Sequence, residues 1–306
     1  MLSPSAARFF SREAPAALAL SLALFSSALF SSAQLAAQDE LGKKERVRVA
    51  INWAKYEDSK SYVIEYESII PRSTVKQVCD ALDEVLTQYI LVFRYKPTAK
   101  LKVKFLDSQN TYEQEGGKPS TAGFFSSGTE YLYLKQLPFY ELIPTAYHEA
   151  FHQYLHHYLG KEANPPTWFN EGMATYFEGI QRSKETKKLD YKLIDNRKMR
   201  MVKDKVATRA ALPLEKLFAL TYDEFYDKED PRNTDFHYSQ SFGVVYFFMQ
   251  KMGGKPIFQF ADALKSTKEL GPAYEKLLGK DRKNLKAVEA NWKAYVAQLK
   301  VDEPKR

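Results

Sequence analysis

One short run of residues constrains this chain more than any other part of its sequence. His148, Glu149 and His152 form a His-Glu-x-x-His pattern, and on an α-helix positions i and i+4 lie one above the other on the same face. Two imidazoles placed in this way can bind one zinc ion, with the intervening glutamate close to the metal. The pattern therefore predicts an α-helix with the side chains of His148 and His152 directed to one site.

A third metal ligand is expected from a second helix. Glu171 follows His152 after the eighteen residues 153–170, and it lies within the sequence Trp-Phe-Asn-Glu-Gly-Met-Ala at 168–174. Two histidines and one glutamate, with a fourth position left for water, form a known catalytic zinc set. We therefore expect one Zn²⁺ ion bound by His148, His152 and Glu171. The alternative is an ordinary amphipathic helix with solvated histidines and glutamates.

The same residues predict a reaction. Zinc in such a site lowers the pKa of its bound water toward about 7 and polarises a carbonyl group. Glu149 points beside the two histidines, where it can take a proton from that water and later give it to a leaving amine. The oxygen that becomes negative during the reaction then needs a donor besides the metal. We expect hydrolysis of peptide bonds, with Glu149 as the general base.

Two segments resemble a known group of enzymes. The sequence 168–178 resembles the second motif of gluzincin zinc metallopeptidases, most closely that of the aminopeptidase N family, and 237–254 resembles the segment that carries that family's oxyanion tyrosine. The resemblance implies that Tyr238 donates to the developing oxyanion; the alternative is an aromatic residue at the start of a helix. Over most of residues 60–300 the chain resembles the small exported bacterial peptidase MA-like family. The resemblance is strong only at 146–179 and 237–254, and elsewhere it is one of pattern.

One departure from the aminopeptidases affects the expected substrate. Those enzymes carry a Gly-x-Met-Glu-Asn segment whose glutamate holds the free amine of the substrate, and residues 121–135 contain no such segment. Glu130 is the only acidic residue there. Cleavage within a polypeptide, or of an unusual amide, is therefore at least as consistent with the sequence as removal of N-terminal residues. The strand at 129–135 is expected either to pair with an extended substrate through an exposed edge or to be an ordinary hairpin strand.

Several other residues near the motifs are weaker candidates. Asn170 precedes the third ligand, and its side chain can hydrogen-bond a metal ligand rather than the metal itself. His156 lies one turn after His152, with His157 beside it, and either can line a cleft or be a partly exposed helix residue. His237, beside Tyr238, can orient a substrate.

The N-terminal residues predict a secretory signal peptide at 1–33. Arg8 and Arg12 precede an apolar stretch at 16–30, and small residues follow at 31–33, which is the layout of a cleaved export signal. The apolar stretch is short for a membrane span, which needs about 20 residues. We expect an exported protein, whether periplasmic, cell-surface or secreted, with membrane contact only through an uncleaved signal.

Composition argues against a nucleic-acid-binding protein and leaves two alternatives to a peptidase open. The net charge is +7, but the lysines and arginines are spread along the chain without a nucleic-acid-binding motif, so no nucleic-acid partner is expected. A basic protein that binds anionic surface polymers is one alternative function. A non-catalytic zinc-holding binding module is another, although closed structural zinc sites usually have four protein ligands, often cysteines. Cys79 is the only cysteine and is expected to be buried and inert.

The expected fold class is α+β, with a small mixed sheet, a zinc-binding helix pair and a helical C-terminal half. The expected divisions are a linker at 34–45, an α/β subdomain at 46–139, the helix pair at 140–181 and a helical subdomain at 182–306. The motif helix is expected to have Pro144 in its first turn and Gly160 at its C-cap. Hydrophobic periodicity predicts strands at 46–53, 61–66, 101–106, 123–125 and 130–135, and helices at 71–93, 167–179, 239–252 and 285–299.

Overall fold

The computed structural model describes residues 48–182, 189–190, 196–279 and 283–301. The chain divides into two units, Met1–Ala50 and Ile51–Arg306, and the elements below all belong to the second. The expected signal peptide at 1–33 and linker at 34–45 lie outside the described residues. None of the helices in the described part combines the length and apolar character that crossing a bilayer requires.

A five-stranded mixed sheet forms the N-terminal part of this unit. Its strands are β1 (Trp53–Tyr56), β2 (Tyr62–Glu67), β3 (Leu101–Leu106), β4 (Gly123–Ser126) and β5 (Tyr131–Lys135). Their order in the sheet is β1-β2-β3-β5-β4, in which β2, β3 and β5 are parallel and the two outer strands are antiparallel to their neighbours. Alternation along β3 buries one side of the strand in the core, as the period-2 sequence pattern predicts.

One expectation about the strands is wrong, and for another the structure decides between two alternatives. The first strand is β1 at Trp53–Tyr56, and residues 48–52 lie outside it. A strand needs hydrogen bonds to a neighbouring strand. The pairing of β1 with β2 begins at Trp53, opposite Glu67 at the end of β2, and so sets where β1 starts. For the strand at 129–135, the alternative of an ordinary hairpin strand is confirmed: β5 lies between β3 and β4, so it has no exposed edge. The outer strand is β4, which forms an antiparallel hairpin with β5.

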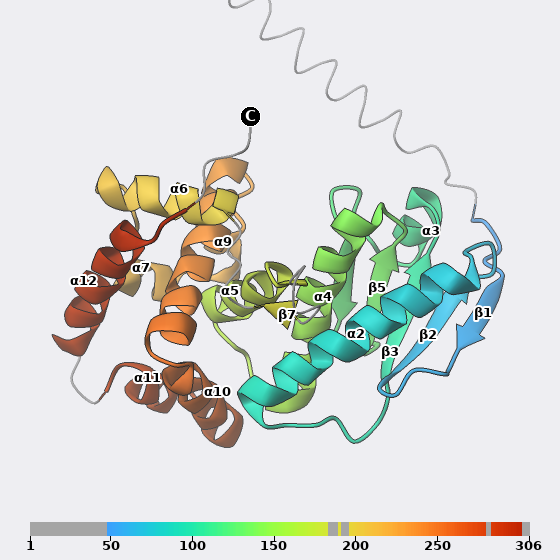
Figure 1. The fold of residues 1–306 in the computed structure, drawn as a ribbon, viewed down its shortest axis with the longest axis horizontal. Helices are drawn as coiled ribbons and strands as arrows, with labels where there is room; N and C mark the ends of the chain where they lie inside the picture. The colour runs from blue at the N-terminus through green and yellow to red at the C-terminus, as the bar shows by residue number, and fades with distance from the viewer. Residues whose placement is uncertain (1–47, 183–188, 191–195, 280–282, 302–306) are drawn as a thin grey trace, which may run out of the picture. The chain divides into compact units, whose positions relative to one another are not determined.

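Two long helices pack near the sheet, as Figure 1 shows. Helix α2 (Arg72–Phe93) buries one apolar face, and Tyr89 donates a 2.5 Å hydrogen bond from its hydroxyl to the carbonyl oxygen of Tyr147 in α4 (Phe139–Leu159). Cys79 is buried in α2, as expected, and burial raises the pKa of its thiol to about 11. The thiol therefore stays protonated and a poor nucleophile.

The motif residues lie on α4, which is longer than expected. Its first residue is Phe139, so Pro144 lies inside the helix rather than in its first turn. Leu142, in the additional first turn, is fully buried. Its packing in the core stabilises this turn, which the positions of proline and glycine in the sequence do not predict. Gly160 forms the C-cap as expected. The side chain of Gln153 ties α4 to the sheet by donating to the carbonyl oxygens of Lys102 and Glu130.

The second motif forms α5 (Thr167–Glu178), which packs on both α4 and α9 (Pro231–Tyr246). Gly172 permits the contact with α9, since a Cβ atom there would lie only 2.8 Å from the carbonyl oxygen of Ser241. Helix α9 begins eight residues before the expected start at 239, because Asp230 caps it and Pro231 occupies its first turn. Tyr238 is therefore well inside a helix and not at its start.

Short helices complete the C-terminal half, so the α+β class with a helical C-terminal half is confirmed (Figure 1). A small hairpin, β6 (Gln181–Arg182) and β7 (Leu189–Asp190), follows α5. A π-helical turn, η1 (Phe247–Lys251), directly follows α9. The remaining helices are α3 (Gln109–Gln114), which lies between β3 and β4, α6 (Asn196–Ala207), α7 (Leu214–Ala219), α8 (Tyr222–Phe225), α10 (Lys255–Thr267), α11 (Leu270–Leu278) and α12 (Lys283–Gln298).

Candidate metal centre

The structure brings the three expected ligands together. Candidate ligand atoms of His148, His152 and Glu171 all lie within 4.8 Å of one another. The Oε2 atom of Glu171 is 3.2 Å from Nε2 of His148 and 3.5 Å from Nε2 of His152. Tetrahedral zinc with bonds of about 2.0–2.1 Å places neighbouring ligand atoms roughly 3.4 Å apart. The observed separations therefore suit a zinc ion.

Hydrogen bonds on the far side of each imidazole set the tautomers. Nδ1 of His148 lies 3.0 Å from a carboxylate oxygen of Glu178, and Nδ1 of His152 lies 2.9 Å from the side-chain oxygen of Asn170. Both partners are acceptors, so each Nδ1–H donates. When the rings are neutral, both Nε2 lone pairs therefore face the carboxylate of Glu171. Three acceptor atoms converge on one point, and only protons or a metal cation can occupy it favourably.

Asn170 is thus placed where the sequence suggested, but the role of Glu178 was missed. Glu178 follows Glu171 by seven residues, or about two helical turns, so both lie on the same face of α5. That spacing was the available signal. Its second carboxylate oxygen accepts a 2.9 Å bond from the ammonium group of Lys198 on α6. Burial favours the neutral form, but the bonds to His148 and Lys198 outweigh it and lower the pKa of Glu178 to about 2.

The charges of the metal-free cluster favour the protonated form of its histidines, most of all His148. Burial lowers the pKa of His148, but hydrogen bonds to Glu171 and Glu178 outweigh burial and raise it to about 10. Burial opposes ionisation of Glu171 as well, yet the two neighbouring histidines hold its pKa well below the usual range. The centre is therefore a carboxylate beside the cationic imidazole of His148, a charge arrangement that a divalent cation can replace.

Glu149 lies beside the cluster on the side of the sheet edge. A Cβ atom added to Gly123 of β4 would lie 3.0 Å from Cγ of Glu149, so the glutamate packs against the outer strand. The side chain is partly exposed. Burial raises the pKa of Glu149, while the charges of His148 and His152 lower it, and burial prevails. A carboxylate in this setting can exchange a proton with a water molecule or a substrate.

Tyr238 also lies at the centre, with its ring 6.2 Å from the ring of His148. Its hydroxyl donates a 3.2 Å hydrogen bond to the hydroxyl of Tyr226. Tyr226 in turn donates a 2.6 Å bond to Oε1 of Glu171. Sequence reasoning missed Tyr226, which immediately follows the short helix α8 and belongs to no recognised motif.

Comparison with known proteins gives similarity but no activity. Residues 142–270 match a family described as "Protein of unknown function (DUF1570)". That match covers 129 of the 306 residues and includes every residue of the cluster described above. No curated protein matches the chain.

The remaining histidines contact other groups. Nδ1 of His237 donates a 2.9 Å bond to the carbonyl oxygen of Phe225, so His237 holds α8 against α9. Nε2 of His156 lies 4.0 Å from a carboxylate oxygen of Glu130, which is paired with Lys161 at 2.8 Å. The ring of His157 contacts the ring of His156. Among the described residues, the group that can hold a metal ion consists of His148, His152 and Glu171.

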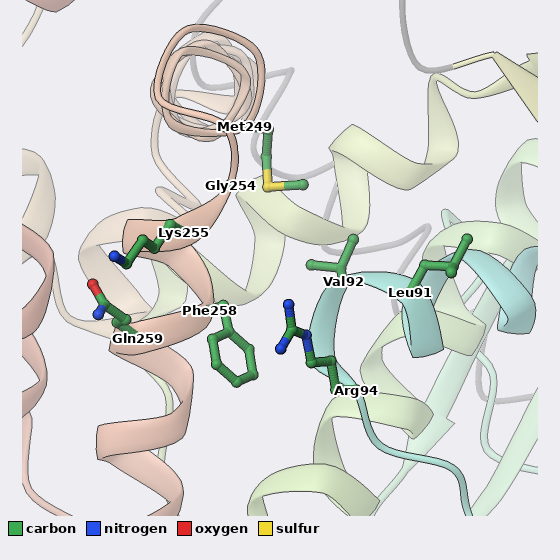
Figure 2. Close-up of a pocket in the computed structure, with 9 residues that line it drawn as sticks. Leu91, Val92, Arg94, Met249, Gly254, Lys255, Phe258 and Gln259 are labelled. Atoms are coloured by element: carbon green, nitrogen blue, oxygen red, sulfur yellow. The ribbon is translucent and has the colours of Figure 1, made fainter.

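A separate pocket of about 450 Å³ lies between the end of α2 and the start of α10, as Figure 2 shows. Its lining is apolar and basic and contains no histidine or carboxylate, so it offers neither metal ligands nor an acid–base pair. The residues that line it are Leu91, Val92, Arg94, Met249, Gly253, Gly254, Lys255, Phe258 and Gln259.

Proposed function

We propose that this protein is a zinc-dependent peptidase. The observation that carries the proposal is the convergence of two imidazole nitrogens and one carboxylate oxygen at separations of 3.2 and 3.5 Å, with Glu149 adjacent. A zinc ion held by His148, His152 and Glu171 supplies Lewis-acid chemistry, since it polarises a carbonyl group and makes water more acidic. The other steps belong to the side chains around the site.

Glu149 acts as the general base. Burial raises the pKa of Glu149. A higher pKa makes the carboxylate a stronger base, which favours proton transfer near neutral pH. Partial exposure of the side chain leaves it accessible to water. The same carboxyl group, once protonated, returns the proton to the amine that leaves.

Tyr238 supplies a hydrogen-bond donor to the oxygen that becomes negative. Burial and the nearby charge of Glu171 raise the pKa of Tyr238, so its hydroxyl remains protonated and able to donate. In the structure it donates to Tyr226, and this bond places the donor before a substrate binds. The substrate carbonyl would then take over as acceptor. Removal of one such donor typically costs about 10²–10³ in kcat.

The expected substrate is a peptide or protein in an extended conformation. Glu149 packs against Gly123 of β4, and β4 is the outer strand of the sheet. A polypeptide that pairs with this edge by strand addition would pass close to the general base. Glu130, the only acidic residue at 121–135, is already paired with Lys161, which favours cleavage within a chain over recognition of a free amine. The N-terminal sequence alone supports export.

The test is digestion of a mixed peptide library, read by mass spectrometry. Zinc-loaded protein should cleave peptides, and Glu149→Gln should not, although it should still bind zinc. Glu141→Gln is the matched control, because it makes the same change at an exposed position in the first turn of the same helix. If neither the original protein nor the control cleaves any peptide while zinc binds at one ion per chain, the protein is a zinc-holding binding module instead.

A further inference from the structure

The two oxygens of the Glu171 carboxylate have different partners. Oε2 faces the Nε2 atoms of His148 and His152, whereas Oε1 accepts the 2.6 Å hydrogen bond from Tyr226. Glu171 is only 4% exposed, so its carboxylate cannot exchange these partners freely with water. One oxygen of the carboxylate therefore faces the candidate metal position, and the other binds a tyrosine.

Tyr226 also contacts the candidate oxyanion donor. Its hydroxyl accepts the hydrogen bond from Tyr238 while it donates to Glu171, and the two tyrosine rings lie 5.9 Å apart in an edge-to-face arrangement. Burial and the charge of Glu171 raise the pKa of Tyr226, which keeps the hydroxyl protonated. One partly buried tyrosine therefore links a candidate metal ligand to a catalytic candidate.

The preceding helix fixes the position of Tyr226. Thr221 and Glu224 form a reciprocal capping box at the start of α8. Phe225 is fully buried, and its carbonyl oxygen accepts the bond from His237. These contacts hold the backbone immediately before Tyr226 in place.

The segment after Tyr226 is held as well. The side chain of Asp227 accepts hydrogen bonds from the backbone N–H groups of Glu229 and Asp230, and from the side chain of Asn233 in α9. Tyr226 is thus anchored on both sides, although it lies between helices. Such anchoring is what a side chain needs to hold a ligand in a defined orientation.

We propose that Tyr226 is a positioning residue of the metal centre, which restricts Glu171 to binding through one oxygen and holds the hydroxyl of Tyr238 beside it. A carboxylate with both oxygens available can bind a cation through one or both of them. Binding through both would fill a position that a catalytic zinc site keeps open. The first part of this inference requires only metal binding, and the part that concerns Tyr238 rests on the proposed function.

Cobalt substitution tests the first part without any activity measurement. Tyr226→Phe removes the hydroxyl and keeps the ring. With Co²⁺ in place of zinc, the variant should show weaker and shifted visible absorption, as expected when a four-coordinate ion gains a fifth ligand. Loss of a group that supports a ligand should also raise the Kd for zinc about 10- to 100-fold.

Tyr222→Phe is the matched control for these measurements. Tyr222 lies four residues before Tyr226, its ring contacts the Tyr226 ring at 4.5 Å, and it is 60% exposed. The control should keep the original cobalt spectrum and zinc Kd. If Tyr226→Phe, folded by circular dichroism, keeps both as well, the positioning role is overturned. A protein that binds no metal at all would overturn the inference together with the proposed function.

A double-mutant cycle tests the second part. Tyr226→Phe, Tyr238→Phe and the double variant are compared by kcat and KM on one peptide. If Tyr226 acts partly through Tyr238, its removal should lower kcat more in the original protein than in the Tyr238→Phe background, with KM little changed. Strictly additive effects on kcat would overturn this part. Metal binding without cleavage would remove the proposed function and the Tyr238 role, and leave the first part intact.

Discussion

In the proposed function, individual residues at the centre divide into those that would bind a cation and those that would move a proton. His148, His152 and Glu171 present their ligand atoms to one another, whereas Glu149 packs against Gly123 of the outer strand and is not one of these three residues. Changes to the two groups should therefore have separable effects. A ligand change should remove the metal, and a change at Glu149 should remove only the reaction.

The first prediction separates these two groups. Glu149→Gln keeps the shape of the side chain and removes its capacity to accept a proton, so kcat should fall by about 10²–10⁴-fold, the usual contribution of a general base. Zinc content, measured by atomic absorption after gel filtration, should stay at one ion per chain. His148→Ala or Glu171→Ala should instead lose the metal. A Glu149→Gln protein that cleaves at the original rate would exclude Glu149 as the base.

The second prediction concerns pH. The pKa of His148 is about 10 in the metal-free cluster, so the imidazole carries a proton at pH 7 that must leave before Nε2 can bind zinc. Zinc affinity should therefore rise as the pH increases toward 10 and fall as it decreases. Calorimetry at pH 7 in buffers of different ionisation enthalpy should detect proton release. Binding heats that do not depend on the buffer would contradict this account.

The third prediction concerns Tyr238. Its hydroxyl lies within hydrogen-bond distance of Tyr226 and its ring lies near His148, so Tyr238→Phe should lower kcat by about a hundredfold through the loss of one donor. Zinc affinity should change less than kcat, because Tyr238 is not one of the three candidate ligands, although the charge of Glu171 acts on its hydroxyl. Full activity in this variant would show that the role implied by the family resemblance does not apply here.

At the scale of helices and strands, the sequence predicted those elements that are determined by residues close together in the chain. Helix α2 and strand β3 lie where periodicity placed them, because alternation and helical spacing are local properties. The start of α4 and the length of β1 depended on packing and on strand pairing, and both were placed wrongly. Tyr226 was not predictable, since it contacts Glu171 from 55 residues away and lies between two helices. Nothing in the order of residues predicts such a contact.

The fourth prediction tests how closely two elements must approach. Gly172 follows Glu171 in α5, and a Cβ atom there would lie 2.8 Å from the carbonyl oxygen of Ser241 in α9. Gly172→Ala should therefore separate α5 from α9 and destabilise the protein by about 1–3 kcal/mol, as overpacking does. Gly128→Ala is the control, because no atom lies within 4 Å of a Cβ added there. Equal melting temperatures for the two variants would show that the approach is not required.

At the scale of the whole molecule, the candidate metal centre lies where helices from different parts of the chain meet. Helix α4 packs on α2 and on the strands of the sheet, and α5 packs on α9 of the helical half. Glu178 extends the connection to α6 through Lys198. A cation bound by His148, His152 and Glu171 therefore bridges the sheet-bound helix and the helix that contacts the C-terminal half.

The fifth prediction follows from this bridging position. A ligand that binds only the folded state stabilises it by an amount that grows with its concentration, about 4 kcal/mol at 1,000 times the Kd. Removal of zinc by a chelator should therefore lower the melting temperature, and added zinc should restore it in proportion to the logarithm of its concentration. His148→Ala should melt at the same temperature with and without zinc, because the bridge between α4 and α5 lacks one of its three ligands. A zinc-dependent shift that persists in this variant would place the stabilising ion elsewhere, and would separate the stability of the fold from the centre formed by the two helices.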